Sequence, residues 1–158
     1  MLEPIKTKTL RAGSSSFAIV ASKYNARYVD SMLHAAQAEL KRVGAKAISV
    51  VRVPGAYEIP VVASRLAGSR KFSAVICLGV ILRGETTHAA HIGEAVSQAL
   101  MNIQVAHGVP VIHEVLLLEN EQQARVRCLD PKHNRGREAA QTALEMARVI
   151  AGLEEKGG

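Results

Sequence analysis

The residues best suited to chemistry in this sequence lie between Arg83 and His88 (RGETTH). An apolar run ends here, a glycine permits a tight turn, and two threonines precede a predicted helix. Free backbone N–H groups at a helix start bind anions, and hydroxyls beside them add hydrogen bonds. His88 lies near the positive end of the helix, which favours a neutral imidazole able to transfer a proton. The segment predicts a phosphate site with an acid–base group. The alternative is a threonine that caps the helix beside an exposed histidine.

A second candidate is the segment Val53 to Pro60 (VPGAYEIP). Its Pro-Gly pair forces a turn at which a ligand can touch the backbone. Tyr57 offers an aromatic face, and Glu58 accepts hydrogen bonds from hydroxyl or amine groups. The alternative is an ordinary strand-to-helix turn with Glu58 near a helix N-terminus. Tyr24 follows the first predicted strand, where it either stacks on a flat ring or packs at the start of a helix.

The segment from Glu121 to Arg137 holds five basic and two acidic residues, half of the chain's net charge of +6. Guanidinium groups match phosphate oxygens in a bidentate manner, although a charge run is also typical of a solvated face. His88, His91 and Glu94 recur every three residues, so we considered a metal site. No specific ligand motif accompanies them, and the sequence predicts no metal.

Composition narrows the class of protein. A chain of 158 residues with 48% hydrophobic and 22% charged residues is typical of a single folded domain. Aromatic residues make up 3%, which disfavours single-strand nucleic-acid binding by stacking. The longest apolar run, Ala74 to Leu82, is about half the length of a membrane helix, and the first residues lack the apolar region of a secretory signal. Cys77 and Cys128 form no disulfide framework, which favours a reducing cytoplasm.

Hydrophobic periodicity predicts strands that alternate with helices. The strands are 17–21, 47–53, 74–82 and 111–118, and the apolar sets of the helices begin at Tyr28, Ile59, Ile92 and Ala140. Gly44 ends the first helix, and Asn120 with Gln123 forms a capping box that opens a short one. We expect an N-terminal arm at 1–15, one domain at 16–154 and a frayed tail at 155–158.

This order predicts parallel βαβ units, and hence a three-layer α/β/α sandwich around a central four-stranded parallel sheet. Ligands of such sheets bind outside the carboxyl ends of the strands. That rule selects four segments, which are 22–25, 54–58, 82–88 and the stretch from His113 onward.

Four segments together carry a family resemblance. They are Ser22 to Asn25 (SKYN), Val53 to Pro60, Gly79 to His88 (GVILRGETTH) and Gln122 to Arg127 (QQARVR). From about Phe17 to Ile150 the chain resembles lumazine synthases, the 6,7-dimethyl-8-ribityllumazine synthases. The resemblance implies a flavodoxin-like fold and the penultimate reaction of riboflavin biosynthesis. In that reaction 5-amino-6-(D-ribitylamino)uracil condenses with 3,4-dihydroxy-2-butanone 4-phosphate, giving the lumazine, orthophosphate and water without a cofactor.

The resemblance also implies roles for individual residues. His88 is the implied catalytic acid–base group. Arg135 stands where lysine is common in the family and is implied to support the residues that touch the substrates. Glu85, Thr86 and Arg127 are implied to bind the butanone phosphate. The residues implied to bind the pyrimidine substrate are Tyr24, Ala56, Tyr57, Glu58, Val80, Ile81, Leu82 and His113.

The sequence departs from the family pattern at three places. Ala89 and Ala90 follow His88 where an aromatic residue and then an acid are usual. Glu85 stands where a small residue is common, and His113 where phenylalanine is common. Our hypothesis is that His113 adds a polar contact to the pyrimidine site.

In this family the active sites lie between neighbouring subunits of a pentamer, and in shell-forming members pentamers assemble further into a shell of about sixty subunits. Tyr24, Glu58 and His88 are then expected from one chain and Arg127 from the next. The expected partners are small-molecule substrates and further copies of the chain, with no nucleic acid and no membrane. Two other readings stay open, which are a flavin- or nucleotide-binding module without synthase activity and a nucleic-acid-binding protein that uses residues 121–137.

Overall fold

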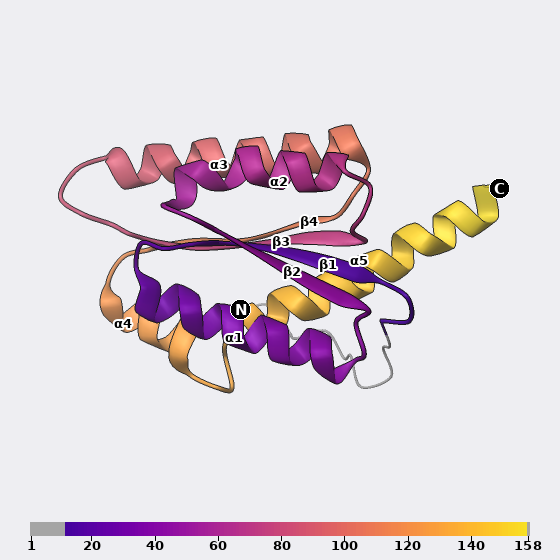
Figure 1. The fold of residues 1–158 in the computed structure, drawn as a ribbon. Helices are drawn as coiled ribbons and strands as arrows, with labels where there is room; N and C mark the ends of the chain where they lie inside the picture. Colours follow the sequence, from indigo (N-terminus) through magenta and orange to yellow (C-terminus); the bar gives the residue numbers. More distant parts are fainter. Residues whose placement is uncertain (1–11, 158) are drawn as a thin grey trace.

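The structure, a computed structural model, describes residues 12–157 (Figure 1). Its four strands run parallel in one sheet of order β2-β1-β3-β4. They are β1 (Ser16–Ser22), β2 (Ala47–Val53), β3 (Ala74–Leu82) and β4 (Val111–Leu118). The last three have the predicted bounds, and β1 is longer by one residue at each end.

Helices cover both faces of the sheet (Figure 1). One face packs against α1 (Ala26–Arg42) and α5 (Arg135–Gly157), and the other against α2 (Ile59–Gly68) and α3 (His88–His107). Between β4 and α5 lie the short helix α4 (Glu121–Ala124) and a π-helical turn, η2 (Arg125–Leu129). The predicted α/β/α sandwich with a four-stranded parallel sheet is confirmed, consistent with a flavodoxin-like fold.

The sheet separates two apolar cores. Alternate side chains of β3 enter opposite cores, with Ile76 and Leu78 facing α1 and α5 while Val75 and Cys77 face α2 and α3. Eight of its nine residues are buried for this reason. A strand buried on both faces needs apolar residues at every position, which explains the uninterrupted run in the sequence.

The helices α1 and α5 approach each other closely at Gly136, the second residue of α5. A Cβ atom at this position would overlap the carbonyl group of Met32 in α1. Asn134, just before α5, donates through Nδ2 to the Cys128 carbonyl at 2.8 Å and accepts from Gly136 N at 2.8 Å. A glycine is therefore required where these two backbones meet.

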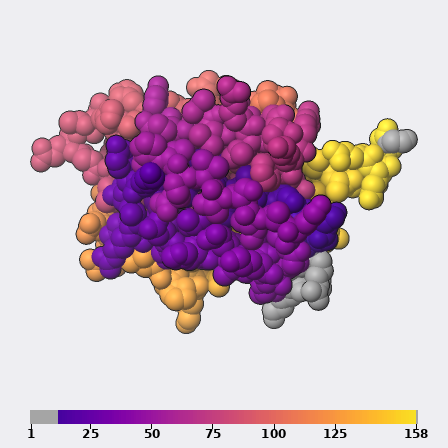
Figure 2. Space-filling model, viewed as in Figure 1, coloured from indigo at the N-terminus to yellow at the C-terminus, as the bar shows by residue number. Residues whose placement is uncertain are grey.

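Two expectations about the ends of the chain need correction or restriction. Helix α5 continues to Gly157, so residues 155–157 are helical and not the frayed tail that the sequence predicts. The last turns of this helix project from the body of the chain (Figure 2, yellow). The expected arm at 1–15 lies mostly outside the described residues, but Ala12 is buried and bonds the Val43 carbonyl.

The capping box that opens α4 is only half formed. Asn120 accepts from Gln123 N through its side chain at 2.9 Å, as predicted. The Gln123 side chain accepts from Glu119 N, one residue before the expected partner, also at 2.9 Å. Within residues 12–157 no helix is both long and apolar enough to cross a membrane.

Candidate active site

A cavity of about 760 Å³ opens at the carboxyl ends of β1 and β3. The order of the sheet reverses between these two strands, because β2 lies beyond β1 and β4 beyond β3. Such switch points are where parallel α/β sheets bind ligands, and the volume is typical of a small-molecule site. Eight of the candidate residues line this one cavity, namely Tyr24, Ala56, Tyr57, Glu58, Val80, Ile81, Leu82 and His88.

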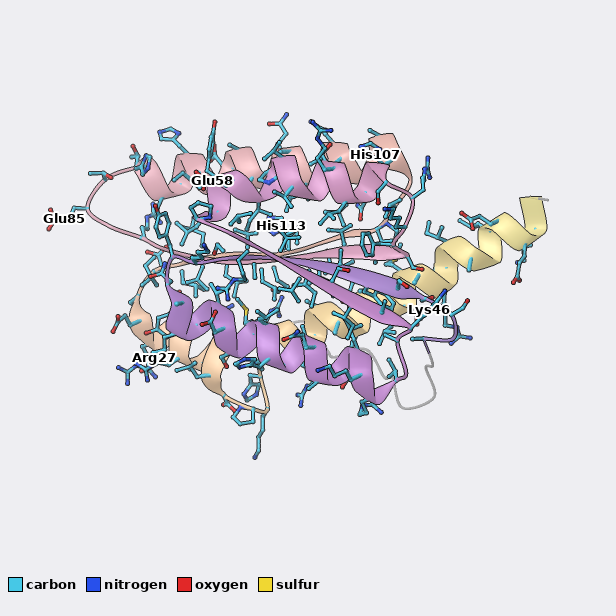
Figure 3. The ribbon with its side chains drawn as sticks, in the orientation of Figure 1. Arg27, Lys46, Glu58, Glu85, His107 and His113 are labelled. Carbon is cyan, nitrogen blue, oxygen red and sulfur yellow. The ribbon has the colours of Figure 1, made fainter. Side chains whose placement is uncertain are left out.

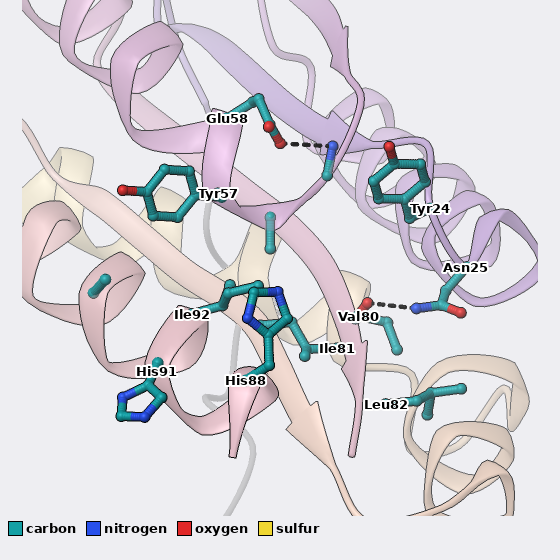
Figure 4. Close-up of a pocket in the computed structure, with 13 residues that line it drawn as sticks. Tyr24, Asn25, Tyr57, Glu58, Val80, Ile81, Leu82, His88, His91 and Ile92 are labelled. Carbon is teal, nitrogen blue, oxygen red and sulfur yellow. Dashed lines mark hydrogen bonds between the residues drawn. The ribbon is translucent and has the colours of Figure 1, made fainter. Parts of the chain in front are cut away.

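His88 is the first residue of α3, and its ring is directed into the cavity (Figure 4). Thr87 occupies the N-cap position but makes no side-chain cap. Instead, the hydroxyl of Thr86 accepts a hydrogen bond from His88 N at 3.4 Å. The positive end of α3 thus places an imidazole beside the space that a ligand would fill.

Tyr24 and Tyr57, residues that are 67% and 66% exposed, give the cavity two aromatic rings (Figure 4). The Tyr24 ring lies against the backbone of Gly55, where a Cβ atom would come within 2.7 Å of its Cδ2. Glu58 closes this turn by accepting from Gly55 N through Oε2 at 3.0 Å. The Pro-Gly turn therefore makes room for the Tyr24 ring and holds the Glu58 carboxylate in place.

Asn25 joins the ends of β1 and β3. Its backbone adopts the left-handed conformation, with φ of 57°, which asparagine tolerates better than most residues. Its Nδ2 donates to the Val80 carbonyl at 2.7 Å, so this strand-end acceptor is already engaged (Figure 4).

Sequence reasoning missed five residues that line the cavity, namely Asn25, Gly55, His91, Ile92 and Ala95. Asn25 and Gly55 belong to the motifs that were recognised. His91 and Ala95 follow His88 at helical spacing of three and seven residues, a signal that indicates a shared face of α3.

Glu85 and Thr86 do not line the cavity. Both are exposed, in the loop between β3 and α3. Glu85 lies at the outer part of this loop and points away from the domain (Figure 3). Within one chain, the loop therefore offers these side chains to solvent.

His113 also lies outside the cavity, in β4, with its ring toward α3. Its Nδ1 accepts from Val115 N at 3.2 Å, so in the neutral ring the proton is on Nε2. This Nε2 lies 2.7 Å from Ser97 Oγ, which donates to the Gly93 carbonyl at 2.8 Å. Partial burial lowers the pKa of His113, which also favours the neutral ring.

Arg127 and Arg135 lie on the side of the sheet covered by α1 and α5, away from the cavity. Arg127 is exposed in the π-helical turn η2, a rare structure that is frequent at functional sites. Ser31 Oγ donates to the carbonyl of Cys128 at 2.6 Å, and Asn134 bonds the same oxygen. Arg127 is thus presented from a turn whose backbone is fixed to α1.

Both cysteines are free and lie in the interior of the fold. Burial raises the pKa of Cys77 to about 12 and that of Cys128 to about 11, so both thiols stay protonated at neutral pH. No group of three or more His, Cys, Asp or Glu side chains within residues 12–157 is arranged to hold a metal ion.

Comparisons with known proteins identify one family. Residues 14–151 match the family described as 6,7-dimethyl-8-ribityllumazine synthase. A protein of that name from Xanthomonas oryzae pv. oryzae (strain PXO99A) is 41% identical over 143 residues, covering 89% of this chain and 93% of its own. One from Stenotrophomonas maltophilia (strain R551-3) is 41% identical over 142 residues, covering 89% and 92%. With its fold, its motifs and these relatives in agreement, the chain belongs to the 6,7-dimethyl-8-ribityllumazine synthase family.

Proposed function

We propose that this enzyme, a transferase, condenses 5-amino-6-(D-ribitylamino)uracil with 3,4-dihydroxy-2-butanone 4-phosphate. The products are 6,7-dimethyl-8-ribityllumazine, orthophosphate and water. The observation that carries this proposal is the cavity itself, in which a helix-start histidine faces a space bounded by exposed tyrosine rings and a carboxylate. Such a site suits a flat, polar ring that must exchange protons.

The reaction needs an amine to attack a ketone, phosphate to leave by elimination, and the second ring to close. His88 moves protons in these steps, since its ring reaches the space where the substrates meet. Tyr24 stacks on the pyrimidine, and Glu58 accepts from the ribityl chain or ring. Holding the two substrates together supplies much of the acceleration, because a bimolecular step becomes effectively unimolecular.

A complete site requires a second copy of the chain. The residues that line the cavity include neither lysine nor arginine, although one substrate carries a phosphate. Arg127 is exposed on the opposite side of the sheet, so it serves the cavity of a neighbour and not its own. A ring of subunits, proposed here as a pentamer that assembles further into a shell, brings the two surfaces together.

Replacing Arg127 by alanine raises the KM for the butanone phosphate by about tenfold or more and leaves the KM for the pyrimidine unchanged. The reason is the loss of a charge-assisted hydrogen bond to the phosphate. Steady-state kinetics with each substrate varied in turn measures both constants. Arg125→Ala is the matched control, since Arg125 is exposed in the same turn. Equal effects of the two substitutions would contradict a specific role for Arg127.

Mixed oligomers test the shared site. His88→Ala and Arg127→Ala subunits, each weak alone, are unfolded, combined in equal amounts and refolded. About a quarter of the sites then pair an intact His88 with an intact Arg127 from the neighbour, and activity rises toward that fraction. A mixture no more active than its two components would show that both residues act within one chain.

His113 lies outside the cavity of its own chain, so its proposed polar contact to the pyrimidine, like that of Arg127 to the phosphate, is made in the cavity of a neighbouring subunit. His113→Phe tests that contact. We expect the pyrimidine KM to rise a few-fold as that contact is lost. In the unsubstituted enzyme the contact also weakens on acidification, because protonation of Nδ1 removes the acceptor for Val115 N and turns the ring. The pKa of His113 is lowered, so this loss occurs below the ordinary titration range of histidine, and the variant lacks it. An unchanged KM and pH profile would refute the contact.

We propose the cytoplasm as the location of this reaction. Cys77 and Cys128 are both free and buried, which supports a reducing compartment.

A further inference from the structure

The face of the sheet opposite the cavity carries a buried acid that no step above uses. Glu114 lies in β4, faces α5 and is 8% exposed. Its neighbours on this face of the strand, Ile112 and Leu116, belong to or pack against the apolar core. A carboxylate in such surroundings is costly unless a cation pairs with it. Burial accordingly raises the pKa of Glu114, and Arg135 opposes that rise.

Arg135, the first residue of α5, pairs with this carboxylate. Its Nε and Nη2 approach Oε2 and Oε1 of Glu114 at 3.3 Å each. Its Nη1 lies 2.9 Å from Oε2 of Glu138, one turn along α5. All three guanidinium nitrogens therefore face carboxylate oxygens, and the Arg135 side chain is only 27% exposed. The positive charge of Arg135 is balanced, and its donors are turned toward the protein.

Arg127 differs from Arg135 in each of these respects. It is exposed, and within residues 12–157 its side chain makes neither an ion pair nor a hydrogen bond. Its charge is nevertheless close enough to lower the pKa of Glu114. Of the two guanidinium groups that lower the pKa of Glu114, that of Arg135 is in ion-pair contact with the carboxylate.

We propose that Glu114 sets the strength with which the surface around Arg127 and Arg135 binds phosphate. It does so by neutralising Arg135 and leaving Arg127 as the guanidinium that holds the anion. The inference rests on the proposed function, in which phosphate is part of a substrate and also a product. A surface with two free guanidinium groups would bind the butanone phosphate and orthophosphate more tightly. It would also release the product orthophosphate more slowly. Glu114 acts through Arg135 and is thus a positioning residue.

Glu114→Gln tests the inference, because glutamine keeps the size of the side chain and removes its charge. Arg135 then has one carboxylate partner instead of two, and the surface gains one positive charge. We expect the Kd for inorganic phosphate to fall about threefold, and the KM for the butanone phosphate to fall similarly. The KM for the pyrimidine stays the same. Calorimetric titration of the oligomeric enzyme with inorganic phosphate, together with steady-state kinetics, measures these values.

The double variant Glu114→Gln/Arg135→Met separates charge balance from mere structural support. It removes both members of the pair, so the net charge returns to that of the unsubstituted enzyme and the Kd for phosphate returns with it. Structural damage by the first substitution would not be repaired by the second. Glu121→Gln is the matched control, because Glu121 is exposed in α4 and solvent screens its charge. We expect it to leave the Kd for phosphate nearly unchanged.

A Kd for phosphate that stays constant or rises in Glu114→Gln would overturn the inference. So would a double variant that keeps the tighter binding, or a protein that binds no phosphate in any form. Failure of the proposed function would look different, since the unsubstituted enzyme would then form no lumazine. The phosphate titration decides the role of Glu114 in either case.

Discussion

Replacing His88 by alanine lowers kcat by about a hundredfold or more and leaves pyrimidine binding intact. The cavity loses the imidazole of His88, which is directed into it, while Tyr24, Glu58 and the ends of β1 and β3 remain in place. Proton transfers then depend on water. Single-turnover kinetics with both substrates measures the chemical step, and titration with the pyrimidine alone measures binding.

The matched control is His34→Ala, which removes an exposed histidine from α1 on the other side of the sheet. We expect this variant to keep the kcat of the unsubstituted enzyme. If His88→Ala also keeps it, His88 is not the acid–base group. If both kcat and pyrimidine affinity collapse together, the substitution has disturbed the cavity and has not removed a proton-transfer group.

Replacing Gly136 by alanine destabilises the fold by about 3 kcal/mol. The added Cβ atom overlaps the backbone of Met32, and a backbone carbonyl cannot move aside as a flexible side chain does. Either α1 and α5 move apart or the start of α5 shifts, and both changes disturb the apolar core between them. Urea unfolding measures the loss as a lower midpoint with an unchanged slope.

Gly152→Ala is the control within the same helix. Apart from the adjoining backbone of α5 itself, no atom lies within 4 Å of a Cβ atom built at Gly152, so this substitution is neutral or stabilises α5 by up to about 1 kcal/mol through helix propensity. Equal effects of the two alanines would contradict the requirement for a glycine at the contact between α1 and α5.

Much of the fold was predictable because the pattern of apolar residues along the sequence matches the pattern of buried residues in the structure. The strands Ala47–Val53, Ala74–Leu82 and Val111–Leu118 have their predicted bounds, since Pro-Gly turns and polar loops end the apolar runs where the sheet ends. The end of α5 was not predictable in this way. Its last residues, Glu154 to Gly157, are polar or glycine, and no apolar periodicity marks them as helical.

The cavity was predictable to the extent that strand ends converge in a parallel sheet. The motifs after β1, β2 and β3 meet there because these strands are neighbours. The rule does not bring His113 to the cavity of its own chain, because His113 lies in the body of β4 and hydrogen-bonds to α3 and its own strand. The position of a residue within its strand decides whether it can reach the carboxyl edge.

Contacts that join distant segments leave no local signature. Asn134 and Ser31 are 103 residues apart, yet both bind the Cys128 carbonyl. Glu114 lies in an otherwise apolar strand, and its partner Arg135 opens a helix 21 residues later. Sequence reasoning recognised Arg135 but had no means to find the acid that neutralises it.

An assay with both substrates tests the central claim most directly. The purified enzyme is supplied with 5-amino-6-(D-ribitylamino)uracil and 3,4-dihydroxy-2-butanone 4-phosphate, and lumazine absorbance and phosphate release are followed together. We predict one orthophosphate for each lumazine, with formation that depends on enzyme concentration. Tight binding of a flavin without any lumazine formed from the two substrates would contradict the account and identify a binding module instead.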